Sequence, residues 1–230
     1  MKIIGLIGGM SWESTKLYYE LINQAVREQL GGLHSARIIM VSVDFAPIEA
    51  LLKQRDWAAI APYLVTAAKQ LEAAGAECVL LCTNTMHKLA PQITEHISIP
   101  FFHIIDVLGM ALRADGRKQV GLLGTMATMQ NDELREMLES NYGVAVIVPD
   151  ETDRQSVNQI IFDELCLGQI HSSSRKAYLD VIDRLQAKGA EAVILGCTEI
   201  AMLISDNDTA MPLYDTTTLH ARHATGWSLS

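Results

Sequence analysis

Two stretches of sequence decide the fold of this chain: KIIGLIGGM at residues 2–10 and KQVGLLGTM at residues 118–126. Each is an apolar run that ends in glycine, which is typical of a buried strand followed by a tight turn. Two further pairs match in the same order: GAECVLL (75–81) with GAEAVIL (189–195), and IPFF (99–102) with MPLY (211–214). The spacings between partners, 116, 114 and 112 residues, are nearly constant. We therefore predict two copies of one structural unit.

Apolar runs alternate with amphipathic ones throughout the chain. We expect helices over residues 13–30 and 57–74, and strands over residues 2–8, 37–43, 78–82, 120–123, 145–148 and 192–195. Strands that alternate with helices indicate an α/β fold, here two similar domains, each with a mostly parallel sheet that is covered on both faces. We place the N-terminal domain at residues 1–100 plus 210–230, with a C-terminal strand that returns to it, and the C-terminal domain at residues 101–209.

Composition narrows the class of protein. The 18 Lys and Arg residues against 27 Asp and Glu give a net charge of −9. This argues against a nucleic-acid partner and gives no reason to propose a membrane surface. No apolar run approaches the roughly 18 residues that span a bilayer, and no secretion signal is recognisable, so we expect a cytoplasmic protein. The four cysteines, Cys78, Cys82, Cys166 and Cys197, are expected to be free thiols with no metal site among them.

The ends of the repeated strands suggest the site. Extending the second match by two residues aligns Thr83 with Cys197. Ligands bind beyond the carboxyl ends of parallel strands, and a helix N-terminus there lowers the pKa of a thiol. If the two copies face each other across a pseudo-twofold axis, these ends converge on one cleft between the domains. Two groups on opposite faces of one carbon can remove a proton and return it with inversion, and this chemistry requires no cofactor.

Other residues have functional and structural interpretations. The turn at Gly8-Gly9 either is simply tight or presents backbone N–H groups to a substrate through Met10. Cys82 is an alternative to Thr83, but adjacent strand residues face opposite ways, so we expect it in the core. We interpret Cys78 and Cys166 as packing residues and His220 and His223 as surface residues. Candidates for binding a substrate carboxylate or amino group, or for orienting Cys197, are Asn84, Thr85, Thr125, Thr128, Thr198 and Glu199, with Asp44 as either a cleft residue or a turn cap.

At these residues the chain resembles the aspartate/glutamate racemase family. The motifs are Gly8-Gly9-Met10, Asn84-Thr85 with His87, Leu123-Gly124-Thr125, and Gly196-Cys197-Thr198-Glu199, in the family's order over nearly the whole chain. The resemblance implies two Rossmann-like domains, one catalytic thiol from each, no cofactor, an amino-acid substrate and a homodimer.

The sequence departs from the family pattern at two places. Thr83 stands where the family has its first catalytic Cys. This Thr and Cys pattern is similar to that of a bacterial subgroup of L-aspartate/glutamate-specific or broad-specificity racemases. A hydroxyl is a weak acid, so we expect Cys197 to remove the proton and turnover to favour the L-to-D direction. Glu49 and Cys166 stand where aspartate racemases carry carboxylate-binding Arg and Lys. Lys53 and Arg55 are nearby substitutes or simply solvated helix residues, so dicarboxylate specificity stays open.

Two alternatives are consistent with the sequence. A one-thiol enzyme of the same superfamily, such as an arylmalonate-type decarboxylase, needs only Cys197. A non-catalytic amino-acid-binding protein needs neither Thr83 nor Cys197 as an acid or base.

Overall fold

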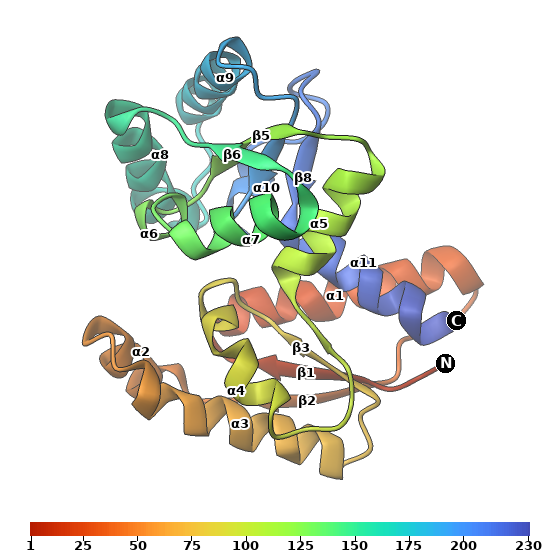
Figure 1. Cartoon of the computed structure of the whole chain (residues 1–230). Coiled ribbons are helices and arrows are strands. Elements are labelled where there is room, and N and C mark those ends of the chain that lie inside the picture. Colours follow the sequence, from red (N-terminus) through yellow and green to blue (C-terminus); the bar gives the residue numbers. More distant parts are fainter. The chain divides into compact units, whose positions relative to one another are not determined.

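The computed structural model describes every residue from Met1 to Ser230. They form two compact units: unit 1 comprises Met1–Ile104 and His220–Ser230, and unit 2 comprises Ile105–Leu219 (Figure 1). Each unit is built on its own four-stranded sheet, in which all pairings are parallel. The predicted α/β class with two parallel sheets is confirmed.

The sheet of unit 1 has the strand order β2-β1-β3-β4. Its strands are β1 (Ile4–Gly8), β2 (Ile38–Ser42), β3 (Cys78–Leu81) and β4 (Phe101–Phe102). The central strands β1 and β3 are buried at every position, because helices cover both faces. The helices are α1 (Trp12–Leu30), α2 (Phe45–Lys53), α3 (Trp57–Ala73), the 3-10 helix η1 (Thr85–Leu89), α4 (Ala90–Thr94) and α11 (Thr216–Leu229).

Two apolar layers hold this sheet. On one face, Leu64 and Leu71 of α3 pack with Ile7 and Leu81. On the other face, α1 and α11 pack against β1 and β3 in a cluster that contains Tyr18, Ile22, Ala221, Ala224, Ile4, Leu6 and Leu80. Because both faces are covered, β1 and β3 need no polar alternation, which explains their continuous apolar runs.

The sheet of unit 2 repeats the same order, β6-β5-β7-β8. Its strands are β5 (Gln119–Leu123), β6 (Ala145–Ile147), β7 (Val193–Leu195) and β8 (Leu213–Asp215). Helices α8 and α9 supply Val157, Ile161, Tyr178 and Ile182 to the core under β5 and β7. The helices are α5 (Ile104–Ala114), α6 (Met126–Met129), α7 (Asp132–Tyr142), α8 (Glu151–Asp163), the 3-10 helix η2 (Leu165–Leu167), α9 (Ser172–Ala187) and α10 (Ile200–Leu203).

Matching glycines in the two copies are explained by the same lack of space for a side chain. A Cβ at Gly5 of β1 would lie 2.7 Å from the Cys78 carbonyl oxygen, and one at Gly121 of β5 would lie 2.8 Å from Leu185 Cδ1. Both distances are below contact, so neighbouring chain occupies the space of a side chain in each unit. The repeat seen in the sequence is therefore a repeat of close packing.

Three expectations from the sequence are wrong. The segment that returns to unit 1 is helical, because β8 pairs with β7 in unit 2 and only the chain from His220 onward belongs to unit 1. His220 is fully buried between Tyr18 and the Phe102 carbonyl, not on the surface, because its two ring nitrogens satisfy those groups. Cys166 is exposed and does not pack in the core.

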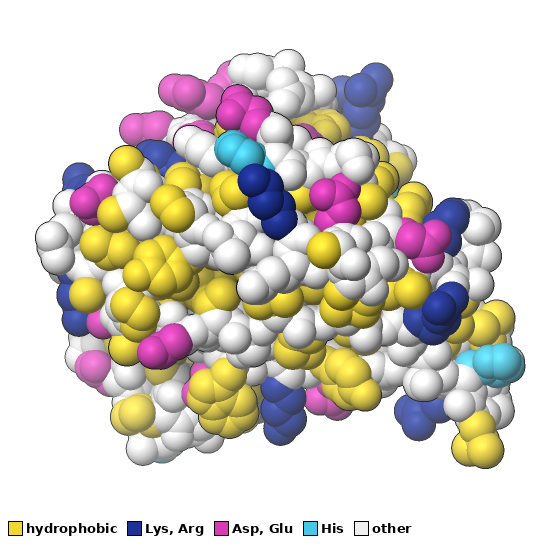
Figure 2. All heavy atoms as spheres, turned by 90° about the horizontal axis from the view of Figure 1, so that it is seen from below, with side chains coloured by type: hydrophobic (Ala, Val, Ile, Leu, Met, Phe, Trp, Pro, Cys, Tyr) yellow, Lys and Arg dark blue, Asp and Glu magenta, His cyan; other side chains and the backbone are white.

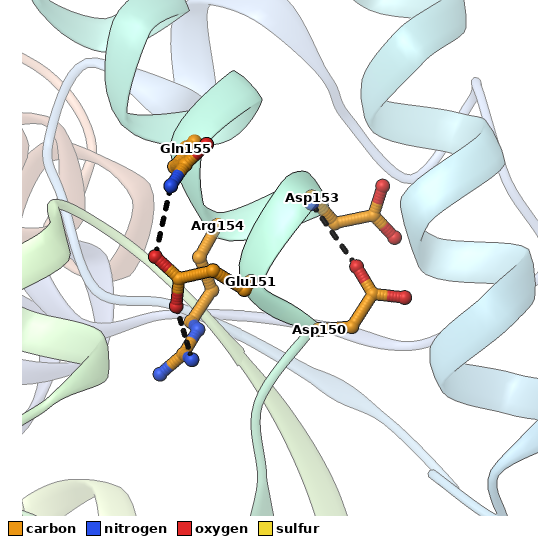
Figure 3. Close-up of polar contacts among 5 residues, drawn as sticks. All are labelled: Asp150, Glu151, Asp153, Arg154 and Gln155. Carbon is orange, nitrogen blue, oxygen red and sulfur yellow. Dashed lines mark hydrogen bonds and ion pairs between the residues drawn. The ribbon is translucent and has the colours of Figure 1, made fainter.

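Helix α8 begins at a well-formed cap. Asp150 Oδ1 accepts a hydrogen bond from the Asp153 N–H at 3.1 Å, and Glu151 accepts from Arg154 and Gln155 in the first turn (Figure 3). Acidic side chains at a helix start complement the dipole. The cap fixes the start of the helix that carries Asn158.

Basic and acidic side chains are interspersed on the face of the molecule shown in Figure 2, with hydrophobic side chains between them. No continuous basic patch is visible there. None of the helices has the length and hydropathy required to cross a bilayer.

Candidate active site

The carboxyl ends of β1 and β3 lie side by side at one edge of the unit 1 sheet. Ile7 is paired with Leu81, and the Cys82 N–H donates to the Ile7 carbonyl at 2.9 Å. In unit 2, the Gly196 N–H donates to the Leu123 carbonyl at 2.8 Å. These two hydrogen bonds are equivalent in the repeat, so the residues that follow, Thr83 and Cys197, stand at equivalent strand ends.

Cys82 faces the core, as predicted. Its side chain is 1% exposed within the cluster of α1, α11 and the sheet. Burial raises its thiol pKa far above the usual range, which keeps the thiol protonated. Thr83, one residue further, is half-buried, as is Asn84, whereas Thr85 is exposed.

His87 ties the Thr83 main chain to η1. Its Nδ1 lies 2.7 Å from the Thr83 carbonyl oxygen, and a carbonyl can only accept, so Nδ1 carries the proton. The His87 side chain is 4% exposed. The sequence places His87 in a family motif but does not predict its contact with the Thr83 main chain.

The turn after β1 is held from within unit 1. The Gly9 N–H donates to Thr15 Oγ1 at 2.9 Å, and that hydroxyl donates to the Ser11 carbonyl at 2.8 Å. Met10 is 5% exposed, and its side chain packs in the core beneath α3. The Gly9 N–H is therefore occupied, and Met10 can offer a ligand only its backbone.

The turn after β5 is also built from threonines. Thr125 and Thr128 hydroxyls lie 3.0 Å apart, and Thr125 Oγ1 accepts from the Thr128 N–H at the start of α6. The Met126 N–H donates to Asn158 Oδ1 of α8 at 2.7 Å. Asn158 was not predicted from the sequence, because a contact across 32 residues leaves no local signal.

Cys197 and Glu199 form a close pair at the end of β7. The thiol Sγ lies 2.9 Å from Glu199 Oε2, and Thr198 Oγ1 donates to the same oxygen at 2.7 Å. All three residues are half-buried. The end of β7 is held by the start of α11, because Thr216 Oγ1 donates to the Leu195 carbonyl at 3.2 Å.

The thiol of Cys197 is protonated in this environment. Burial raises its pKa well above the usual range, and the neighbouring Glu199 carboxylate raises the pKa further. The expected lowering by a helix N-terminus is wrong, because the following helix α10 has only four residues and a carboxylate at its start. If the Cys197 thiol is to become a thiolate, the Glu199 carboxylate, to which it already donates a hydrogen bond, can accept its proton.

Two of the remaining candidates have contacts within α2 and its cap. Lys53 pairs with Glu49 at 2.6 Å on the exposed surface of α2, as solvated helix residues do. Asp44 caps α2 by accepting from the Ala46 N–H. No group of three or more His, Cys, Asp and Glu side chains is arranged to bind a metal ion.

Comparison with known proteins gives a consistent result. The family model for Asp/Glu/hydantoin racemases matches residues 7–224. A crystal structure of a candidate Asp/Glu racemase from Yersinia pestis is 50% identical over the whole of both chains, with a TM-score of 0.95. An aspartate racemase homologue from Pyrococcus horikoshii OT3 is 31% identical over the whole of both chains, with a TM-score of 0.92.

A curated protein is similar at lower identity. The broad specificity amino-acid racemase RacX of Bacillus subtilis is 22% identical over 96% of this chain and 95% of its own length. With the family model covering nearly all of the sequence and two structures matching end to end, this chain belongs to the Asp/Glu/hydantoin racemase family.

Proposed function

We propose that the chain is a cofactor-independent amino-acid racemase in which Cys197 and Thr83 exchange protons with the Cα of one substrate. The observation that carries the proposal is the contact between Cys197 Sγ and Glu199 Oε2 at 2.9 Å. A thiol at a strand end, paired with a carboxylate, is a proton-transfer group with its own proton acceptor.

The proposed reaction begins with transfer of the Cys197 thiol proton to Glu199. The thiolate then removes the Cα proton, and the C–H electron pair is delocalised into the substrate carboxylate. In the L-to-D direction, the Thr83 hydroxyl gives its proton to the opposite face of Cα. Its oxygen then takes up a proton from solvent, and Glu199 releases to solvent the proton that it received from Cys197. Each step moves one proton and leaves the electron count unchanged.

The two ends are unequal as acids and bases. In the L-to-D direction Thr83 acts only as a donor to a strongly basic carbanion. In the reverse direction its hydroxyl would have to act as the base, for which its pKa is far too high near neutral pH. This inequality supports a preference for the L-to-D direction.

The substrate-binding groups are proposed from the same strand ends. Asn84, Thr85, Thr125, Thr128 and Thr198 offer amide and hydroxyl groups, and Met10 offers its backbone. We propose L-aspartate, L-glutamate or a broader range of amino acids as substrates. Support comes from the family and from the similarity to a broad specificity racemase.

The test is a screen of pure L- and D-amino acids in deuterated water, with Cα deuterium followed by NMR or mass spectrometry. We expect deuterium at Cα of L-aspartate, L-glutamate or another L-amino acid, with the D-enantiomer appearing. Binding without any exchange would instead indicate an amino-acid-binding protein. Carbon dioxide released from an arylmalonate, with no exchange into amino acids, would indicate a decarboxylase.

The homodimer and the cytoplasmic location stay predictions. They rest on the family resemblance and on the sequence. Sedimentation of the purified chain at several concentrations would test the first.

A further inference from the structure

The residue of interest is His87, which lies four residues after Thr83 in η1 and is 4% exposed. Its ring contacts the Thr83 segment through a hydrogen bond. The proposed reaction does not use it as an acid or a base, so a buried imidazole at this place needs another explanation.

The hydrogen bond fixes the tautomer of His87. Because Nδ1 donates to the Thr83 carbonyl at 2.7 Å, a neutral ring carries no proton on Nε2. The ring is held neutral, since burial lowers its pKa and nearby His220 and His103 lower it further.

The second nitrogen is an acceptor without a protein partner. His87 Nε2 is fully buried and makes no hydrogen bond within the chain. The surrounding rings belong to His103, Phe101 and His220, with centroids 4.8, 5.7 and 5.6 Å away. Buried acceptors in this position are normally satisfied by ordered water.

His220 does not share this arrangement. Its Nε2 donates to the Phe102 carbonyl and its Nδ1 accepts from the Tyr18 hydroxyl, both at 2.8 Å. Both nitrogens of His220 are satisfied within unit 1, which is the pattern of a structural histidine. The half-satisfied ring of His87 touches the main chain of Thr83 itself.

We propose that His87 is a positioning residue for Thr83: the hydrogen bond from its Nδ1 to the Thr83 carbonyl fixes the Thr83 main chain and thereby the direction of the Thr83 hydroxyl. The inference rests on the proposed racemase function. It assigns His87 to the proton-return half of the reaction only. Proton removal by Cys197 does not depend on it.

Two substitutions separate the roles of the two nitrogens. His87→Asn places an amide N–H near the position of Nδ1 and keeps the bond to the Thr83 carbonyl. His87→Gln places its amide near the position of Nε2 and loses that bond. A matched control exists at His96, whose Nδ1 lies 2.8 Å from the Gln92 carbonyl with the same four-residue separation, but on the exposed surface.

The experiment follows two signals in deuterated water with the L-enantiomer as substrate: deuterium entering the L-enantiomer, and formation of the D-enantiomer. We expect His87→Gln to lower kcat for D-formation about tenfold or more, with KM and deuterium entry into the L-enantiomer within about twofold. His87→Asn should recover most of the lost D-formation. The His96→Asn and His96→Gln variants should match the wild type.

Equal losses of D-formation in both His87 variants, or parallel losses of exchange and inversion, would overturn the inference. A wild type without exchange or inversion would instead refute the proposed function. Nitrogen-15 NMR of histidine-labelled wild-type protein tests the tautomer even if the variants fold poorly. We expect a neutral His87 protonated on Nδ1 at pH 7, and a ring protonated on Nε2 or on both nitrogens would contradict the inference.

Discussion

At the end of β3, Thr83 presents a hydroxyl, and its main chain is tied to a buried, neutral His87. At the equivalent end of β7, Cys197 presents a thiol that donates to the Glu199 carboxylate. The two ends arise from copies of one unit with the same strand order. The β7 end carries a thiol beside a carboxylate, and the β3 end carries a hydroxyl on a main chain that accepts a hydrogen bond from an imidazole. The repeated fold therefore places Thr83 and Cys197 at equivalent strand ends, and in the proposed reaction the side chains at each end set the direction of turnover.

The largest expected effect comes from removing the thiol of Cys197. We expect Cys197→Ala to lower deuterium exchange at Cα on the order of 10³-fold or more, because the base itself is lost. Cys82→Ala is the matched control, since it removes a thiol at the other strand end. It should retain the activity and lose about 1–2 kcal/mol of unfolding free energy, because Cys82 is a core residue. Loss of turnover in Cys82→Ala with a normal melting temperature would make Cys82, not Thr83, the second acid.

The next largest effect is expected at Thr83, where a substitution should slow formation of the D-enantiomer more than deuterium exchange into the L-enantiomer. Thr83→Val keeps the shape but removes the hydroxyl, so D-formation should fall about 10²-fold, within the usual contribution of a general acid. Deuterium entry into the L-enantiomer should persist, because Cys197 can exchange the proton that it removed for a solvent deuteron and return the deuteron to the same face of Cα. Thr83→Cys should make the two ends alike and raise D-to-L turnover by about tenfold or more. Equal rates from both enantiomers in the wild type would contradict the asymmetry.

The positions of the two strand ends can be predicted from the amino-acid sequence itself. The repeat identifies both strand ends and aligns Thr83 with Cys197, because buried strands and their glycines leave local patterns. The environment of each end could not be predicted in the same way. Asn158 reaches the Met126 N–H from another helix, and the buried place of His220 depends on Tyr18 and Phe102, far away in sequence. The direction of the Cys197 pKa shift was predicted wrongly, because the main cause of the shift is the burial of the thiol, which depends on tertiary packing.

A smaller effect is expected from neutralising Glu199. Glu199→Gln removes the negative charge that helps raise the pKa of the Cys197 thiol, so the thiolate should form at lower pH. It also removes the proton acceptor, so Cα exchange should fall about ten- to a hundredfold, the usual loss for a general base. Alkylation by iodoacetamide across pH, read by mass spectrometry at Cys197, measures the first effect. An unchanged alkylation midpoint would show that burial alone sets the thiol pKa.

The smallest expected effect concerns the dependence of the unfolding free energy on acid pH, in which a buried histidine of unit 1 and a buried carboxyl of unit 2 should act in opposite directions. Burial lowers the pKa of His220 to about 3, against an ordinary value of 6.5. The unfolded chain therefore binds a proton that the folded chain refuses. The stabilisation is complete above about pH 6.5 and is lost as pH falls toward 3, by at most about 1.4 kcal/mol per pH unit for one group. In unit 2, burial raises the pKa of Asp215 at the end of β8, so the folded chain takes up a proton there more readily than the unfolded chain, and this carboxyl stabilises the fold as the pH falls.

Urea unfolding of the wild type and of His220→Gln at pH 7, 6, 5 and 4 measures this difference. The variant should be less stable at pH 7, because the Tyr18 hydroxyl loses its ring partner, but its stability should fall less steeply with acid. Asp215→Asn is the counterpart in unit 2, and it should make the fall in acid steeper than in the wild type. Identical slopes in the wild type and His220→Gln would mean that another group, with His87 the first candidate, accounts for the acid sensitivity of unit 1. That outcome would make His87, whose ring contacts the Thr83 main chain, the histidine of unit 1 whose protonation destabilises the fold in acid.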